Sequence, residues 1–190
     1  MRKIIVFTNL SLDGVMQAPG RPDEDTRGDF PYGGWGAPYA AMSFVKNSDL
    51  DTGPLLFGRR TYEDFYSVWP NRTDNPYTQI LNNAQKYVAS NTLKEPLPWI
   101  NSTLLKGDVP AVLAELKSQP GKNFLVMGSG MLVQTLMQHN LVDLYVLLIH
   151  PLIIGTGRRL FIEGSPNTTL RLLNVNSTPN GVTICTYQPV

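Results

Sequence analysis

Short, continuous apolar runs recur along the chain and constrain its fold more than any other feature. Such runs are typical of strands in a parallel sheet, because helices cover both faces and the side chains on both faces are buried. The runs that we interpret as buried strands are KIIVF at 3–7, PLLF at 54–57, KYVAS at 86–90, NFLVM at 123–127 and DLYVLLIHP at 143–151. Since helical patterns separate them, an α/β fold is predicted.

The clearest helical pattern lies at 108–117, where Asp108 is a suitable N-cap and apolar residues recur at the spacing of one helix face. Further helices are expected at 37–48, 59–68 and 130–139. With an optional strand before 108–117, the predicted order is βαβαβ(β)αβαβ. The chain then ends in two strand-like runs around Pro179-Asn180-Gly181. Because an Asn-Gly pair between strands is typical of a tight turn, we expect a mostly parallel central sheet with an antiparallel C-terminal hairpin.

Length and composition exclude several classes of protein. The 190 residues suit a single domain over 1–190, and 16 Lys plus Arg against 15 Asp plus Glu leave a net charge of +1. A surface with so little basic charge is a poor partner for nucleic acid. The single Cys185 and the two histidines are too few soft ligands for a zinc site, although an oxygen-ligated ion stays open.

The apolar segments are too short for a membrane. The run at 4–7, which follows two basic residues, is much shorter than the apolar part of a secretory signal. The longest apolar stretch, 144–149, is far below the roughly 20 residues that a membrane helix needs. We therefore expect a cytoplasmic protein without a membrane partner.

Three segments follow predicted strands with small, polar or basic residues: Gly58-Arg59-Arg60-Thr61, Ser90-Asn91-Thr92 and Gly128-Ser129-Gly130. Ligands of α/β sheets bind at the carboxyl ends of the strands, where helix N-termini favour phosphate. The recurrence of all three at one edge predicts a ligand with several phosphates. Each segment also has a plainer interpretation: Arg59 and Arg60 as solvated surface charges, Ser90–Thr92 as an ordinary turn, and the glycines as half of a dinucleotide fingerprint.

The stretch 17–38 is rich in glycine and proline and has no apolar periodicity, which is typical of a long loop that serves a site. Four aromatic residues in and just after this stretch form either a wall for a flat substrate, which we favour, or a hydrophobic plug for the loop. They are Phe30, Tyr32, Trp35 and Tyr39. Asp13, just after the first strand, is either a polar group of the site or part of a turn. His150, at a strand end, is expected to be structural.

Five of these motifs together resemble the bacterial dihydrofolate reductase-like family, which is related to the reductase domain of the riboflavin-biosynthesis deaminase-reductase. They are SLDGVM at 11–16, LLFGRRTYEDF at 55–65, KYVASNTL at 86–93, LVMGSGMLVQTL at 125–136 and LVDLYVLLIHPLIIGTGRRLF at 141–161. The resemblance runs in order over nearly the whole chain. It implies a three-layer dihydrofolate reductase-like fold, an NADPH site, and a turn at Arg158 and Arg159 that is structural or contacts a second subunit.

Residues of the implied NADPH site follow from the matched motifs. Gly58, Arg59, Arg60 and Thr61 would meet the phosphates, with one arginine at the 2′-phosphate, and Ser90, Asn91 and Thr92 would border the adenosine ribose. Gly128, Ser129, Gly130 and Met131 would hold the pyrophosphate. The main chain near Thr8, Asn9 and Val15 would hold the nicotinamide amide.

The substrate side departs from the family. Dihydrofolate reductases carry W-x-x-P-x-acid, whereas this chain has Trp35-Gly-Ala-Pro38-Tyr-Ala40. Without that carboxylate the pterin loses a charge-assisted hydrogen bond and a proton route, so folate reduction is disfavoured. The riboflavin reductases have Lys after S-L-D-G, where Val15 stands here, which disfavours their phosphorylated pyrimidine as well.

The sequence thus predicts an NADPH-dependent reductase of a small planar heterocycle or a conjugated imine or carbonyl. The substrate would lie over Trp35, and the proton would come from Asp13 or water. The alternatives are an NADPH-binding protein without efficient catalysis, such as a redox sensor, and a structural module without a ligand. A homodimer is also expected, because the strand at 144–149 and a hairpin stripe offer apolar surface. That stripe is Leu170, Leu172, Val182 and Ile184.

Overall fold

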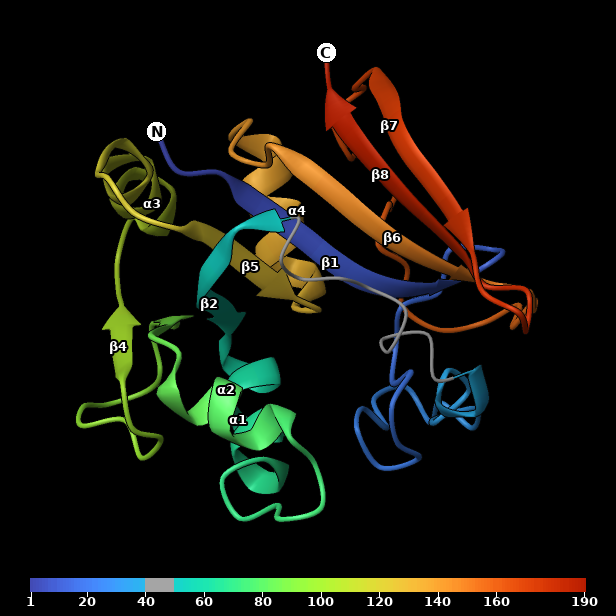
Figure 1. Cartoon of the computed structure of the whole chain (residues 1–190), viewed down its shortest axis with the longest axis horizontal. Coiled ribbons are helices and arrows are strands. Elements are labelled where there is room, and N and C mark those ends of the chain that lie inside the picture. The colour runs from blue at the N-terminus through green and yellow to red at the C-terminus, as the bar shows by residue number, and fades with distance from the viewer. Residues whose placement is uncertain (40–49) are drawn as a thin grey trace.

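The computed structural model describes residues 1–39 and 50–190, and these residues form a single eight-stranded sheet with helices on both faces (Figure 1). The strands are β1 (Ile4–Ser11), β2 (Thr52–Gly58), β3 (Lys86–Ala89), β4 (Ser102–Leu105), β5 (Asn123–Met127), β6 (Leu144–His150), β7 (Leu170–Ser177) and β8 (Thr183–Pro189). The helices are α1 (Arg59–Val68), α2 (Tyr77–Asn83), α3 (Val109–Ser118) and α4 (Gly130–Gln138), and η1 (Ala37–Tyr39) is a 3-10 turn.

The strand order is β4-β3-β2-β5-β1-β6-β8-β7. All pairings among β1 to β6 are parallel, and β8 pairs antiparallel with both β6 and β7. The predicted α/β fold with an antiparallel C-terminal hairpin is therefore confirmed. Because β1, β2, β3 and β5 run in one direction, their carboxyl ends lie at the same edge of the sheet.

The predicted elements correspond closely to the observed ones. The five apolar runs form β1, β2, β3, β5 and β6, and the optional strand is β4. The helix expected at 59–68 is α1. The helix expected at 108–117 is α3, shifted by one residue at both ends, and the one expected at 130–139 is α4, which ends one residue earlier. The helix α2 was not predicted. Of the helix expected at 37–48, only the 3-10 turn η1 falls within the described residues.

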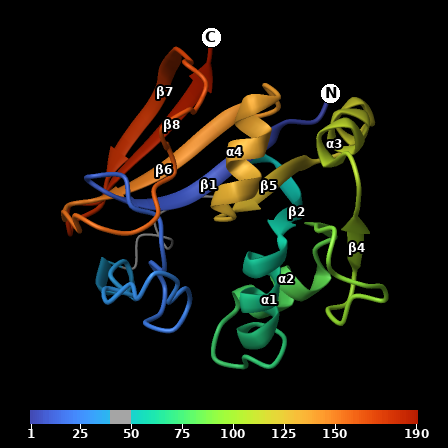
Figure 2. The same cartoon turned by 180° about the vertical axis from the view of Figure 1, so that it is seen from behind.

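Alternate residues of β1 are buried on opposite faces of the sheet. Ile4 and Val6 pack with apolar side chains of α3 and α4, whereas Ile5 and Phe7 pack with those of α1 and α2. Figure 2 shows α3 and α4 on the side of the sheet that faces away in Figure 1. This burial on both faces is the physical reason for the continuous apolar run at 3–7. Among the described residues, no helix has both the length and the apolar character that a bilayer requires.

The C-terminal hairpin has the predicted turn but not the predicted apolar stripe. Gly181 has a positive φ of 87°, which a glycine adopts without strain. Val182 and Ile184 lie in the core and do not form a surface with Leu172. Likewise, β6 is buried between β1 and β8. The exposed apolar side chains are instead Leu172, Leu173 and Val175 of the edge strand β7, each about half exposed. A homodimer stays a prediction, and β7 is now its expected contact.

Candidate functional site

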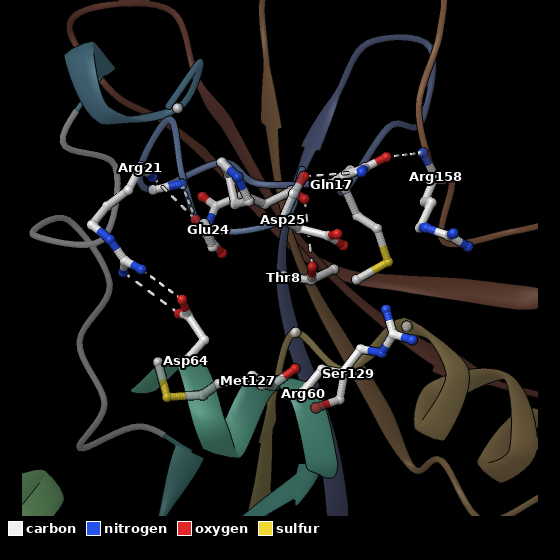
Figure 3. A pocket seen from close by; sticks show the side chains of 18 of the residues that line it. Thr8, Gln17, Arg21, Glu24, Asp25, Arg60, Asp64, Met127, Ser129 and Arg158 are labelled. Atoms are coloured by element: carbon white, nitrogen blue, oxygen red, sulfur yellow. Dashed lines mark hydrogen bonds and ion pairs between the residues drawn. The ribbon is translucent and has the colours of Figure 1, made fainter. Parts of the chain in front are cut away.

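A cavity of about 980 Å³ lies at the carboxyl edge of the sheet (Figure 3). Thr8 and Asn9 at the end of β1 and the turn 127–131 between β5 and α4 form part of its wall. The remaining wall comes from α1, from the loop 16–27, and from residues 157–163. Five segments from different parts of the chain therefore meet around one space, at the edge that the sequence predicted.

Two of the three predicted phosphate-binding segments meet directly. The N–H of Gly58 donates to the Ser129 hydroxyl at 2.9 Å, which joins the start of α1 to the start of α4. Gly128 and Ser129 both have positive φ angles, of 65° and 63°. A Cβ at Gly130 would lie 2.9 Å from Met16 Sδ, so a larger residue at this position would displace Met16. The lack of a side chain at Gly130 therefore lets Met16 pack closely against the turn.

The first turns of α1 and α4 keep free backbone donors. Neither helix has a side-chain N-cap, since Gly58 has no side chain and the Ser129 hydroxyl serves Gly58 instead. Uncapped N–H groups and the positive end of the helix dipole favour an anion. Arg60 and Thr61 line the cavity beside these N-termini, as do Gly130 and Met131. This part of the site combines donors and a cation that suit a phosphate.

Some predicted residues lie outside the cavity lining. Arg59 does not line the cavity, whereas its neighbour Arg60 does, although both side chains are exposed. The Ser90–Thr92 segment follows β3 at the same sheet edge, where the Ser90 hydroxyl accepts the N–H of Thr92, and Asn91 accepts that of Gly107. These contacts correspond to the ordinary turn that was the alternative interpretation.

The main chain of Val15 already has partners. Its N–H donates to the Ser11 hydroxyl at 2.9 Å, and its carbonyl accepts the N–H of Ser11 at 2.9 Å. Val15 is fully buried and does not line the cavity. The prediction that its main chain holds a nicotinamide amide is therefore not supported by the geometry, whereas Thr8 and Asn9 do line the cavity.

Asp13, the candidate proton donor, lies outside the cavity lining and fixes a neighbouring loop. Its carboxylate accepts hydrogen bonds from the Ser11 hydroxyl at 2.7 Å and from the N–H groups of Ile154 and Gly155 at 3.0 and 2.9 Å. The Ser11 hydroxyl, followed by these backbone donors, holds the pKa of Asp13 well below its ordinary value. A carboxylate that stays ionised cannot supply a proton, so the structure assigns Asp13 a structural role in place of the catalytic one.

Replacing Asp13 with asparagine is expected to lower the free energy of unfolding by about 1–2 kcal/mol at neutral pH, because charge-assisted hydrogen bonds are lost. The depressed pKa gives stability that is complete above the unfolded-state pKa and is lost as the pH falls through the folded-state pKa. The difference between wild type and variant should therefore shrink in acid. Urea unfolding of both proteins at neutral and acidic pH measures this difference in stability. Equal midpoints for wild type and variant at neutral pH would contradict the structural role.

The aromatic residues of the loop form a plug and not the predicted wall. Phe30 and Trp35 are buried with Val15 and Ala18, and none of the four candidate aromatics lines the cavity. Trp35 Nε1 donates to the Gln17 carbonyl at 2.7 Å. The Trp35 ring meets His150 edge-on, with 5.2 Å between the ring centroids. Trp35 is thus not placed to contact a substrate, and Ala40, where the family has its acid, lies outside the described residues.

His150 is buried, as expected for a structural residue. Its Nε2 lies 2.9 Å from Asn9 Oδ1, and burial lowers its pKa to about 4. The ring is therefore neutral at physiological pH, so its Nε2 can carry the proton and donate to Asn9. This contact orients a side chain of the cavity wall.

The sequence motifs did not indicate the charged residues that the loop and α1 bring to the cavity. Glu24, Asp25 and Asp64 all line it, and Arg21 forms an ion pair with Asp64 at 2.5 Å. Arg158 also lines it, although we expected a structural residue or a subunit contact there. The one available signal was the acidic run Asp23-Glu24-Asp25 inside the long loop.

Gln17 holds the two loops of the cavity wall together. It is nearly fully buried, and its Nε2 donates to the carbonyls of Asp25 and Arg27 at 3.0 and 2.8 Å. Its Oε1 accepts the N–H of Arg158 at 3.0 Å. The acidic loop is therefore anchored against the segment that begins at 157.

The sheet order, the antiparallel hairpin and the cavity at the strand ends define an α/β protein of the dihydrofolate reductase fold. Within this fold, the chain belongs to the RibD C-terminal domain family, whose model matches residues 2–184. The resemblance seen in the sequence motifs is thus confirmed.

Known relatives agree with this assignment. The uncharacterized protein YwjB of Bacillus subtilis is 31% identical over 181 residues, which cover 90% of this chain and 89% of that protein. A protein of Shewanella sp. PV-4 assigned provisionally to riboflavin biosynthesis has a TM-score of 0.69 at 24% identity, over 100% of this chain and 99% of that one. Dihydrofolate reductase from Enterococcus faecalis, solved with NADP(H), has a TM-score of 0.58 at 14% identity, over 98% and 96% of the two chains.

Proposed function

We propose that this protein is an NADPH-dependent reductase that transfers a hydride to a small planar heterocycle or a conjugated imine or carbonyl. The observation that carries the proposal is the meeting of two uncapped helix N-termini, a glycine turn and Arg60 in one cavity. Its volume of about 980 Å³ is at the upper end of the range of ligand sites, so part of a dinucleotide and a small substrate can share it. The NADP(H) in the distant Enterococcus enzyme supports the choice of cofactor.

The residues present fit the cofactor at its phosphates. The open N–H groups at the start of α4, together with Arg60 and Thr61, would hold a phosphate group, and the positive φ of Gly128 lets the backbone approach it closely. Thr8 and Asn9 would lie beside the nicotinamide, with Asn9 oriented by His150. The bound cofactor supplies the hydride. The chain itself positions both molecules and covers them with the loop 16–27.

The two candidate functions differ in whether the protein catalyses a reduction efficiently. A protein that binds NADPH without efficient catalysis was suggested by Ala40, which stands where the family has an acid. The cavity nevertheless contains other carboxyl groups, among them Glu24, Asp25 and Asp64. A reductase could therefore obtain its acid from a different element of the fold, and we favour the enzyme.

Binding of NADPH is expected to raise the melting temperature by about 5–10 °C at a concentration of about 100 times Kd, because a ligand selective for the native state adds about 2.7 kcal/mol. Differential scanning fluorimetry with NADPH, with NADH and with no nucleotide measures this. No shift with either nucleotide would refute the cofactor site. Oxidation of NADPH on addition of pterins, quinones, nitro compounds or imines then separates a reductase from a binding protein, which would show the shift alone.

A further inference from the structure

The carboxyl group of Glu24 lies at the cavity wall, and among the described residues it forms no ion pair. Its Oε2 accepts the backbone N–H groups of Gly20 and Arg21 at 2.6 and 3.1 Å. Its other oxygen, Oε1, has no hydrogen-bond partner among the described residues. Figure 3 shows the carboxyl between Arg21 and the group around Gln17 and Thr8. One oxygen therefore fixes the side chain, and the other stays free to act on a ligand.

Gly20 is shaped to receive this carboxyl group. A Cβ built on Gly20 would lie 2.9 Å from Glu24 Oε2, closer than two such atoms can approach. Its φ is not among the positive values found at other glycines, so backbone strain does not explain why glycine stands here. The absence of a side chain at Gly20 is what lets the carboxyl group of Glu24 reach its two backbone donors.

The charged groups that face Glu24 largely neutralise each other. Arg21, on the same loop, forms a 2.5 Å ion pair with Asp64 of α1. Burial, with a further contribution from the Asp64 charge, raises the pKa of Glu24 above its ordinary value, although the N–H of Gly20, the N–H of Arg21 and the Arg21 charge oppose the rise. Because burial favours the neutral form, the carboxyl group keeps its proton to a higher pH than an exposed glutamate does.

The other carboxyl groups of the lining are less suited to give up a proton. Burial raises the pKa of Asp25, but the hydrogen bonds from Arg27 outweigh it and bring that pKa below its ordinary value. Asp64 is paired with Arg21. Asp23, Glu63 and Glu163 are exposed to solvent. Each of these carboxyl groups is therefore either held by a guanidinium or open to solvent. Glu24 is thus the half-buried carboxyl group of the described lining that combines a raised pKa with a free oxygen.

We propose that Glu24 is the general acid of this site, which protonates the nitrogen of a C=N substrate as the hydride reaches the carbon. The proposal rests on the proposed reductase function. NADPH gives two electrons and a hydrogen as hydride and becomes NADP⁺, a new C–H bond forms, and the C=N double bond becomes single. The nitrogen takes the proton from Glu24 Oε1, which leaves a carboxylate, and a proton from solvent restores the acid.

The test compares two acceptors with the same ring system, of which only one needs a proton. Dihydroisoquinoline is a flat, neutral cyclic imine, and its N-methyl iminium salt already carries the positive charge that protonation would create. The variants are Glu24→Gln, which keeps the size and one acceptor oxygen, and Gly20→Ala, which displaces the carboxyl group. Glu115→Gln, on the exposed side of α3, is the matched control. NADPH oxidation is followed with each acceptor over a range of pH.

Glu24→Gln is expected to reduce imine turnover by roughly 100-fold or more, as the loss of a general acid does, and to leave iminium turnover nearly unchanged. Gly20→Ala should show the same selectivity with a smaller loss. The wild-type rate with the imine, divided by that with the iminium, should fall as the pH rises through the pKa of Glu24. An equal loss with both acceptors would show a purely structural role and overturn the proposal.

A second measurement does not depend on turnover. The ¹³C signal of the Glu24 carboxyl group, assigned by its absence in the folded Glu24→Gln variant, should titrate at a higher pH than the ordinary range of glutamate. Titration within that ordinary range would overturn the proposal even if the variant were inactive. A wild-type protein that reduces neither acceptor would refute the proposed function, whereas wild-type and Glu24→Gln proteins that are equally active would refute only the role of Glu24.

Discussion

Replacing Arg60 with alanine is expected to weaken NADPH binding by roughly 10- to 150-fold, because a lost charge-assisted hydrogen bond is worth about 1.5–3 kcal/mol. Arg60 lines the cavity, and Figure 3 shows it beside Ser129 at the glycine turn. The adjacent Arg59 is outside the lining, so Arg59→Ala should leave the affinity almost unchanged. The sequence could not choose between the two arginines. The structure does so because a helix turns consecutive residues by about 100°.

Titration calorimetry with NADPH and NADH on both variants measures this difference, and it also locates the contact. The sequence predicts a preference for NADPH, set by an arginine at the 2′-phosphate, which only NADPH carries. If Arg60 meets that phosphate, NADH affinity should not change in the variant. If it meets the shared pyrophosphate, as its place beside Ser129 favours, both affinities fall together. Wild-type affinity of Arg60→Ala for both nucleotides would refute the phosphate site at this turn.

The sheet could be predicted because the signals for its strands are local. The run at 123–127 and the helix pattern after it carry their own periodicity, so β5 and α4 are found to within a residue. The helix α2 lacks such a signal, since it has only seven residues, most of them polar, and follows Asn75-Pro76. Its first N–H is satisfied by the Asn75 side chain, a contact that the sequence does not distinguish from a turn.

The candidate site could be predicted only where it follows the strand ends. Gly128–Met131 and Arg60 are at the cavity because strand direction determines their place. The role of Asp13 depends on Ile154 and Gly155, which are 141 and 142 positions away, and no local pattern encodes such a pairing. The same holds for Glu24, whose environment includes Asp64 of α1. Contacts between loops decide the acid–base chemistry, and the sequence alone does not show them.

The second large effect is expected at Lys86, a fully buried residue of β3 that satisfies the end of α2. Its ammonium group donates to the carbonyls of Leu81, Asn82 and Ala84 at 2.8, 3.1 and 2.7 Å. It also lies 4.6 Å from the centre of the Trp99 ring. These carbonyls lie at and just beyond the last turn of the helix, and only that of Asn82 has a second donor, the side chain of Asn101 at 3.3 Å, among the described residues. The negative end of the helix dipole adds to the attraction.

Replacing Lys86 with methionine, which has a similar length but no donor, should lower the free energy of unfolding by about 3 kcal/mol, since buried carbonyls lose their partner. For a chain of this size, that corresponds to a fall in Tm of about 6–12 °C. Lys106→Met is the control, because Lys106 is exposed and a surface change of this kind shifts stability by less than about 0.5 kcal/mol. Calorimetry compares the three proteins.

If both variants melt together with wild type, the carbonyls at the end of α2 must have another source of donors, and the buried charge of Lys86 makes no net contribution to stability. A selective loss in Lys86→Met would instead show that one buried ammonium group fixes α2 against β3.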